Sequence, residues 1–191
     1  MGFVENQKNV KKLCSFYVSD FHLVTMILPY ISKKLKEEAK VETMLDKSIS
    51  KNVECLIKNL NLNSKTKEEI NQIGWNEKKP LKYGRFTKEM ESMLKENGNI
   101  VFFISGSREY IDGVNRNLDK WLLENKRMMK KENKYITIVN CYEVLQFNDN
   151  IKEILDKHDK ILNTSGEKEI NEVFAGYTRK EEKALGSVVN D

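Results

Sequence analysis

The sequence predicts an α/β domain built as a three-layer sandwich, with a mostly parallel central sheet. Three observations lead to this fold class. Short apolar runs alternate along the chain with stretches of helical periodicity. One run, residues 100–104, is apolar at every position, which is typical of a strand covered on both faces of a parallel sheet. The chain has 191 residues, enough for one ordinary domain.

Four segments have the composition of strands. Residues 100–104 (Ile-Val-Phe-Phe-Ile) give the clearest pattern, residues 13–18 and 135–142 are apolar and aromatic, and residues 40–46 are a weaker candidate. We expect 13–18, 100–104 and 135–142 to be the core strands.

Helical spacing of apolar residues marks the segments between these strands. Residues 21–39 follow Ser19 and Asp20, which are N-cap types, and carry an apolar stripe. Pro29 lies inside this segment and removes a backbone donor, so we expect a kink or a fresh first turn there. Further helices are expected from Ser50, from a capping box at Thr66 and Glu69, around 86–94, after the turn 105–107, and over 151–162.

The predicted organisation is a single domain over 1–164 followed by a short helical and charged tail over 165–191. The tail has one apolar patch, Ile170, Val173 and Phe174, which we expect to dock on the sheet of its own chain. Residues 126–134 are interpreted as a charged, solvated connection.

Composition argues against several classes of protein. The net charge is only +4, and the basic run 126–134 contains Glu132 and lacks stacking aromatics, so a nucleic-acid partner is not favoured. The three cysteines form no C-x-x-C pair, which fits reduced thiols in the cytoplasm. The longest apolar stretch, 21–31, is too short to span a bilayer, so no membrane partner is expected.

Ligands of open parallel sheets bind beyond the carboxyl ends of the strands. No G-x-x-x-x-G-K-[ST] or G-x-G-x-x-G pattern occurs, and the first turn, Val-Ser-Asp-Phe-His-Leu, has no glycine. We therefore predict no phosphate-binding loop, no cofactor, no metal and no catalytic residue. The candidate ligand-binding residues lie at the ends of three strands: Tyr17, Asp20, His22, Ser105, Ser107, Arg108, Cys141, Tyr142 and Glu143.

Each candidate also has a structural interpretation. The segment from Ser105 to Arg108 would suit an anion, but small residues before a helix are more often plain caps. Asp20 and His22 could form an acid/base pair, although a structural histidine is favoured. His158 is interpreted as a hydrogen-bonded core residue on the apolar stripe of its helix.

Several short motifs together resemble the MEDS domain, the methanogen/methylotroph DcmR-type sensory domain. Residues 13–17 (Leu-Cys-Ser-Phe-Tyr) and 28–31 (Leu-Pro-Tyr-Ile) resemble its opening strand and helix. The strand ending Ile104-Ser105-Gly106 resembles its middle strand. Its closing part is matched by 138–143 (Ile-Val-Asn-Cys-Tyr-Glu), Phe147, 151–155 and His158.

This chain departs from the family pattern at several positions. Lys12 stands in place of the first histidine of the family, Phe102 or Phe103 in place of an arginine, and Glu143 in place of an aspartate. The resemblance covers roughly residues 11–163. It implies a RecA/KaiC-like fold that has lost its phosphate loop and serves as a sensory or regulatory module.

We therefore favour a non-catalytic, cytoplasmic sensory or regulatory module that binds a small ligand or a signalling protein. Its expected partners are a second copy of itself, or a kinase or transcription regulator acting in trans. The alternative is an α/β enzyme with a site at the strand ends, formed by Asp20, His22 and Arg108. A nucleic-acid-binding regulator is the less favoured third hypothesis.

Overall fold

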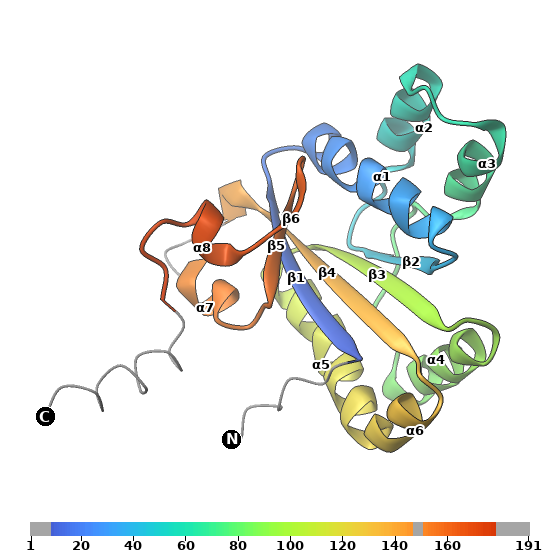
Figure 1. The fold of residues 1–191 in the computed structure, drawn as a ribbon. Coiled ribbons are helices and arrows are strands. Elements are labelled where there is room, and N and C mark those ends of the chain that lie inside the picture. The colour runs from blue at the N-terminus through green and yellow to red at the C-terminus, as the bar shows by residue number, and fades with distance from the viewer. Residues whose placement is uncertain (1–8, 147–150, 179–191) are drawn as a thin grey trace, which may run out of the picture.

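The computed structural model describes residues 9–146 and 151–178, and a six-stranded sheet forms its centre (Figure 1). The strand order is β2-β3-β4-β1-β5-β6, in which β1 to β5 are parallel and β6 is antiparallel to β5. The predicted three-layer α/β fold with a mostly parallel sheet is thus confirmed. The strands are β1 (Val10–Tyr17), β2 (Lys40–Leu45), β3 (Asn99–Gly106), β4 (Tyr135–Glu143), β5 (Lys160–Asn163) and β6 (Gly166–Lys168).

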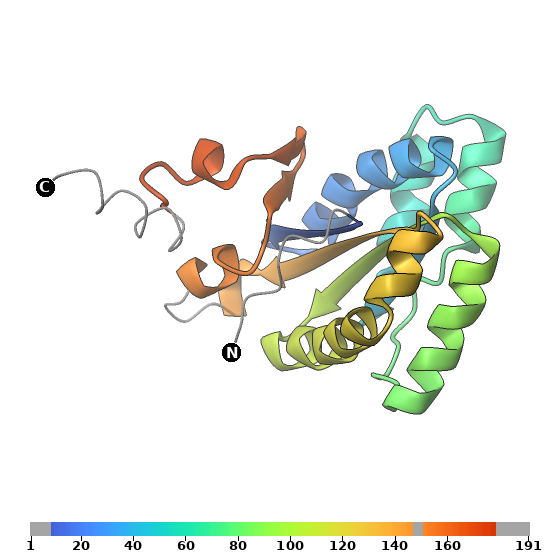
Figure 2. The same cartoon turned by 60° about the horizontal axis from the view of Figure 1, so that its bottom comes forward.

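Helices cover both faces of the sheet (Figure 2). The first three pack on one face, called the α1 face here, and the others pack on the opposite α5 face. The helices are α1 (Asp20–Lys36), α2 (Ser50–Asn59), α3 (Ser64–Gln72), α4 (Tyr83–Glu96), α5 (Arg108–Glu124), α6 (Lys126–Lys131), α7 (Ile151–Leu155) and α8 (Ile170–Val173), with a short 3₁₀ turn η1 (Val144–Gln146).

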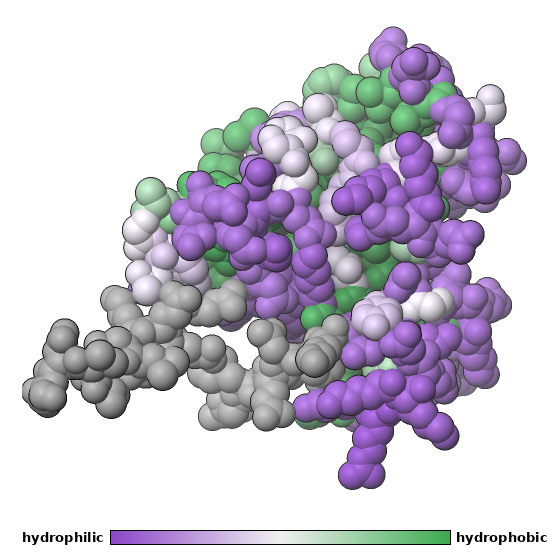
Figure 3. Space-filling view, viewed as in Figure 1, coloured by the Kyte–Doolittle hydropathy of each residue, from purple (hydrophilic) through white to green (hydrophobic). Residues whose placement is uncertain are grey.

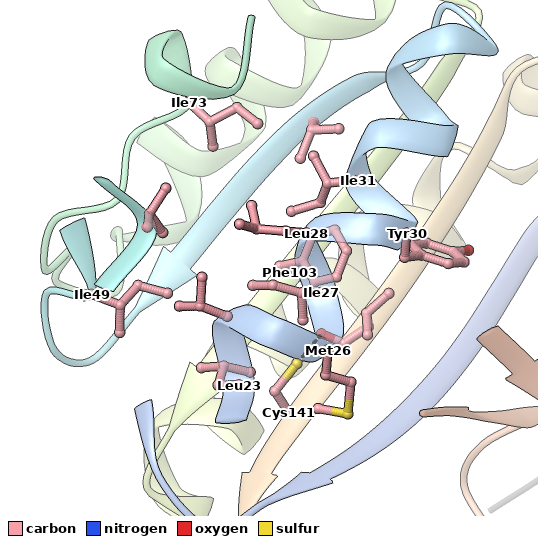
Figure 4. Close-up of a cluster of buried hydrophobic side chains, with 14 of the residues drawn as sticks. Leu23, Met26, Ile27, Leu28, Tyr30, Ile31, Ile49, Ile73, Phe103 and Cys141 are labelled. Carbon is pink, nitrogen blue, oxygen red and sulfur yellow. Dashed lines mark hydrogen bonds between the residues drawn. The ribbon is translucent and has the colours of Figure 1, made fainter. Parts of the chain in front are cut away.

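The three predicted core strands, β1, β3 and β4, lie together in the middle of the sheet. Because side chains alternate along a strand, β3 places Phe102 on the α5 face and Phe103 on the α1 face, and both are buried. On the α1 face, Ile27, Leu28 and Ile31 of α1 form a dry cluster with Phe103 (Figure 4). This cluster fixes α1 against the sheet.

Helix α1 runs through Pro29 as a single helix, so the expected fresh first turn is wrong. Pro29 and Thr25 lie on the exposed side of α1. The carbonyl that loses its partner to proline therefore faces solvent, where water can satisfy it.

Two helix starts differ from the sequence prediction. The N-cap of α3 is Asn63, whose Oδ1 accepts a hydrogen bond from the Thr66 amide at 2.7 Å. Thr66 is buried within the first turn, so the predicted capping box at Thr66 and Glu69 is wrong. The N-cap of α2 is Ile49, and Ser50 is the first helical residue.

Three segments form other elements than predicted. The basic run 126–134 is not only a connection, because 126–131 form α6 and bury Met129. The predicted helix 151–162 ends at Leu155 as α7, and its last residues form β5 instead. The Asp159 amide donates to the Lys12 carbonyl at 2.8 Å, which joins this segment to β1. Ser105 and Gly106 belong to β3 rather than to the turn.

The chain after 164 contributes to the sheet. Strand β6 pairs with β5, so the expected boundary at 164/165 falls inside a hairpin. Ile170 is buried on the α5 face and Phe174 packs edge-on against Phe16 at 6.0 Å, whereas Val173 is exposed. Residues 179–191 and Phe147 of the resemblance lie outside the described residues.

Candidate functional site

The connections that follow the neighbouring strands β1 and β4 cross the sheet in opposite directions. The chain leaves β1 through α1 on one face and returns at β2, on the far side of the sheet. It leaves β4 through η1 and α7 on the other face and passes over β1 to reach β5. In open α/β sheets ligands bind at such a point, outside the carboxyl ends of the two strands. Tyr17 and Glu143 are the last paired residues of these strands.

The turn between β1 and α1 is held by local hydrogen bonds. The Ser19 hydroxyl caps α1 by accepting from the His22 amide at 3.2 Å. The Val18 amide donates to Nδ1 of His22 at 3.3 Å. His22, a predicted site residue, therefore stabilises the turn through hydrogen bonds with the backbone and with Ser19. Asp20, its predicted acid/base partner, pairs with Lys47 instead.

Lys47 links the start of α1 to the end of β4. Its Nζ lies 2.8 Å from Oδ1 of Asp20, in the first turn of α1, and 3.8 Å from Oε2 of Glu143. The Asp20 carboxylate beside it raises the pKa of Lys47, which favours the charged ammonium. The positive end of α1, which favours an anion, is next to a carboxylate of the chain itself.

The prediction of site residues missed Lys47. The second strand was expected at 40–46, and the rule that ligands gather at strand carboxyl ends applies equally to the residue after it. The spacing in the sequence, however, gives no sign that Lys47 reaches across to Asp20.

Buried hydroxyl and thiol groups lie below this ion cluster. The hydroxyl oxygens of Tyr17 and Ser105 are 3.1 Å apart on the α1 face. Burial raises the pKa of the Tyr17 phenol and of the Cys141 thiol, which keeps both protonated. Tyr17 and Cys141 are therefore buried, protonated groups.

The turn after β3, considered as an anion site but expected to be a plain cap, contacts Asp46. Oδ2 of Asp46 accepts from the Ser107 amide at 3.2 Å, and the Ser107 hydroxyl accepts from the Tyr110 amide at 3.2 Å as the cap of α5. A side chain at Gly106 would place its Cβ 2.4 Å from Cβ of Asp46, so glycine is required for this close approach. The geometry matches the structural interpretation of this turn as a cap.

Arg108 and Tyr142 lie on the other side of the sheet. Nη2 of Arg108 is 2.6 Å from Oε2 of Glu153, and its Nε is 3.8 Å from Asp112. Tyr142 faces α5 and stacks against Phe16, with ring centroids 6.0 Å apart. The sheet thus divides the predicted site residues into two groups: Tyr17, Ser105 and Cys141 on the α1 face, and Tyr142 with Arg108 on the α5 side.

His158 is a buried, hydrogen-bonded core residue, as the sequence suggested, but it follows α7 rather than lying on a long helix. Its Nδ1 donates to the Ile154 carbonyl at 2.6 Å, so its Nε2 accepts from Nδ2 of Asn140 at 2.9 Å. Oδ1 of Asn140 accepts in turn from Asn115 at 2.9 Å. Within 9–146 and 151–178, no three His, Cys, Asp or Glu side chains form a group that could hold a metal ion.

Large apolar side chains are exposed around the same carboxyl edge of the sheet. Figure 3 shows hydrophobic surface there, at the upper left, near the ends of β1 and β4. Two of these residues follow β1 and three follow β4. The carboxyl-edge surface, as we name it, consists of Val18, Phe21, Val144, Leu145 and Ile151, which are 56%, 50%, 43%, 82% and 40% exposed. None of the helices that the structure describes is both long and apolar enough to cross a membrane.

Comparison with known proteins gives no family. No protein-family model and no curated protein matches the chain. Among solved structures, an ATPase domain matches with 11% identity and a TM-score of 0.44, over 81% of this chain and 68% of the other. A KaiC-like protein from the archaeon Pyrococcus horikoshii matches with 12% identity and a TM-score of 0.45, over 79% and 69%. Likeness at this level carries nothing about activity, and membership of the MEDS family stays a prediction.

Proposed function

We propose that this chain is a non-catalytic, cytoplasmic regulatory module that acts by association through its carboxyl-edge surface. The observation that carries the proposal is the exposure of five large apolar side chains around the strand ends where α/β proteins bind their ligands. Apolar surface of this kind is unfavourable in water and becomes favourable when a partner covers it.

The pairing of the polar side chains at the strand ends supports binding rather than turnover. Lys47 is paired with Asp20 and Glu143, and the Tyr17 hydroxyl is paired with Ser105. Phosphoryl transfer needs a cradle for the phosphates and a cation to neutralise them. At this edge Asp20 places a carboxylate at the start of α1, Glu143 places another at the end of β4, and Lys47 pairs with both.

The favoured partner is a second copy of this chain. Val18 and Val144 directly follow Tyr17 and Glu143, which are paired in neighbouring strands, so both valines lie at the same part of the sheet edge. A patch close to a two-fold axis can cover its own copy, which is the commonest way for soluble proteins to associate.

Light scattering at micromolar concentration tests this association. We expect a dimer for the natural chain and a monomer for the double variant Phe21→Asp, Leu145→Asp, because each aspartate would be buried without a partner. The matched control is Leu123→Asp on α5, whose leucine is 68% exposed and lies outside the carboxyl-edge surface. It should remain a dimer.

Two results would contradict the proposal. A natural chain that stays monomeric would remove its basis, as would an equal effect of the control and the double variant. Hydrolysis of magnesium-ATP, or tight magnesium-dependent binding of ATP in calorimetry, would show that the module is an enzyme or a nucleotide-binding protein instead.

A further inference from the structure

An open pocket of about 560 Å³ lies beside β2, an edge strand of the sheet. Strands β2 and β3, helix α4 and the segment 78–81 line it. This volume falls within the range of roughly 300–1,000 Å³ that small-molecule sites occupy. None of the predicted site residues lines this pocket.

Five side chains form its apolar part. Phe86 and Phe102 line the pocket but are nearly inaccessible, so the half-buried Met44, Leu81 and Met93 supply most of its apolar surface. The flexible thioethers of Met44 and Met93 adapt their shape to a flexible chain, and Leu81 closes one side. Such a surface suits an unbranched hydrocarbon.

The charged residues of the pocket are unevenly paired. Glu42 lies between Lys78, at 3.4 Å, and Lys40, at 3.6 Å. Arg85 pairs with Glu89 one helical turn on, at 3.3 Å. Lys79 has no carboxylate partner among the residues that the structure describes. Three cations and two carboxylates line the pocket, and its charge is therefore net positive.

We propose that this pocket binds a small amphipathic monoanion, a medium-chain carboxylate, with its hydrocarbon on the Met and Leu surface and its carboxylate at Lys79. The hydrocarbon leaves water on binding, and the carboxylate gives Lys79 an anionic partner that no described side chain of the protein supplies. This site goes beyond the proposed function, because it shares no residue with the carboxyl-edge surface.

Titration calorimetry with decanoate, below its micelle concentration, tests whether Lys79 binds the carboxylate. Lys79→Glu should weaken decanoate binding by about fivefold, the effect of reversing one exposed charge. Lys88→Glu is the matched control, since Lys88 is exposed on α4 but does not line the pocket. It should leave the affinity unchanged. Decyltrimethylammonium, which has the same tail and the opposite charge, should bind at least about fivefold more weakly than decanoate.

A second variant tests the cavity itself. Ser92 is exposed on α4 and lines the pocket, so Ser92→Trp fills the space without displacing a core side chain. We expect decanoate binding to be lost while the urea midpoint of unfolding stays the same.

Three outcomes would overturn the proposal: no heat with decanoate and the natural chain, equal weakening by Lys79→Glu and Lys88→Glu, or binding of the cationic amphiphile as tight as that of decanoate. The proposed association has its own variants at Phe21 and Leu145, neither of which touches the pocket. Failure of one proposal is therefore distinguishable from failure of the other.

Discussion

Phe102 and Phe103 are neighbours in β3, but they lie in different surroundings. Phe103 faces α1 and meets the Tyr30 ring edge-on, with centroids 6.1 Å apart, inside a closed apolar cluster. Phe102 faces α4 and lines the open pocket beside β2. Their exposed fractions are almost equal, 1% for Phe103 and 3% for Phe102. Both rings are thus buried, but only Phe102 lies beside an open pocket.

The largest expected effect separates these two rings. Phe103→Ala should lower the free energy of unfolding by about 3–5 kcal/mol, because the closely packed side chains around it cannot move in to fill the cavity. Phe102→Ala should cost about 1–2 kcal/mol less, because its site lies beside an open pocket whose half-buried methionines, Met44 and Met93, can close partly over the space. Urea denaturation of both variants measures the difference. Equal losses, or the reverse order, would show that the two faces are packed alike.

The two faces also differ in how they satisfy buried polar groups. On the α1 face buried hydroxyls make separate local contacts: Ser15 Oγ lies 2.7 Å from the Leu162 carbonyl oxygen and 3.0 Å from Sδ of Met26, and the Tyr17 and Ser105 hydroxyls pair with each other. On the α5 face Asn115, Asn140 and His158 form a connected series of side-chain hydrogen bonds. In such a series the loss of one member leaves others without a partner.

Breaking this network should have the second largest effect. His158→Leu removes the acceptor of the Asn140 amide and should cost about 1–3 kcal/mol of unfolding free energy. Asn140→Leu should cost a similar amount. Since both remove the same hydrogen bond, the double variant should lose less than the sum of the two, as chemical denaturation would measure. Strict additivity would show that the two side chains act independently.

At the β6 edge the α1 face is closed by a charged group. Glu167 accepts a hydrogen bond from the Tyr30 hydroxyl at 2.7 Å and pairs with Lys11. Burial of Glu167 raises its pKa, but the bonds from Lys11 and Tyr30 outweigh this and hold the pKa below its ordinary value of 4.5. The folded chain therefore favours the charged form of Glu167.

The smallest expected effect follows from that lowered pKa. Glu167 contributes to stability above pH 4.5, its ordinary pKa, and this contribution is lost as the pH falls through the lowered value. Glu167→Gln should lower the unfolding free energy by about 1 kcal/mol at neutral pH, and the difference should vanish in acid. Unfolding midpoints across this pH range test it. Glu37→Gln, an exposed control beside Lys34, should change stability by less than about 0.5 kcal/mol. A constant difference at every pH would contradict the role of charge.

Much of the fold was predictable because its signals are local. The unbroken apolar run of 100–104 marked a doubly covered strand, and 13–18 and 135–142 were recognisable from their own composition. The end of α7 was not, because Ile161 and Leu162 continue a helical spacing and only pairing with β1 makes them a strand. Local patterns cannot report a partner that is far away in the sequence.

The candidate site shows the same division. The sequence alone placed Tyr17, Asp20 and Glu143 at strand ends, and it excluded a glycine-rich phosphate loop, because both follow from residue types at fixed positions. Only the tertiary structure decided that Lys47 pairs with Asp20 and that Arg108 pairs with Glu153. It also decided that Phe102 borders a pocket. These contacts depend on strand order and on the paths of loops, which bring together residues that no spacing in the sequence relates.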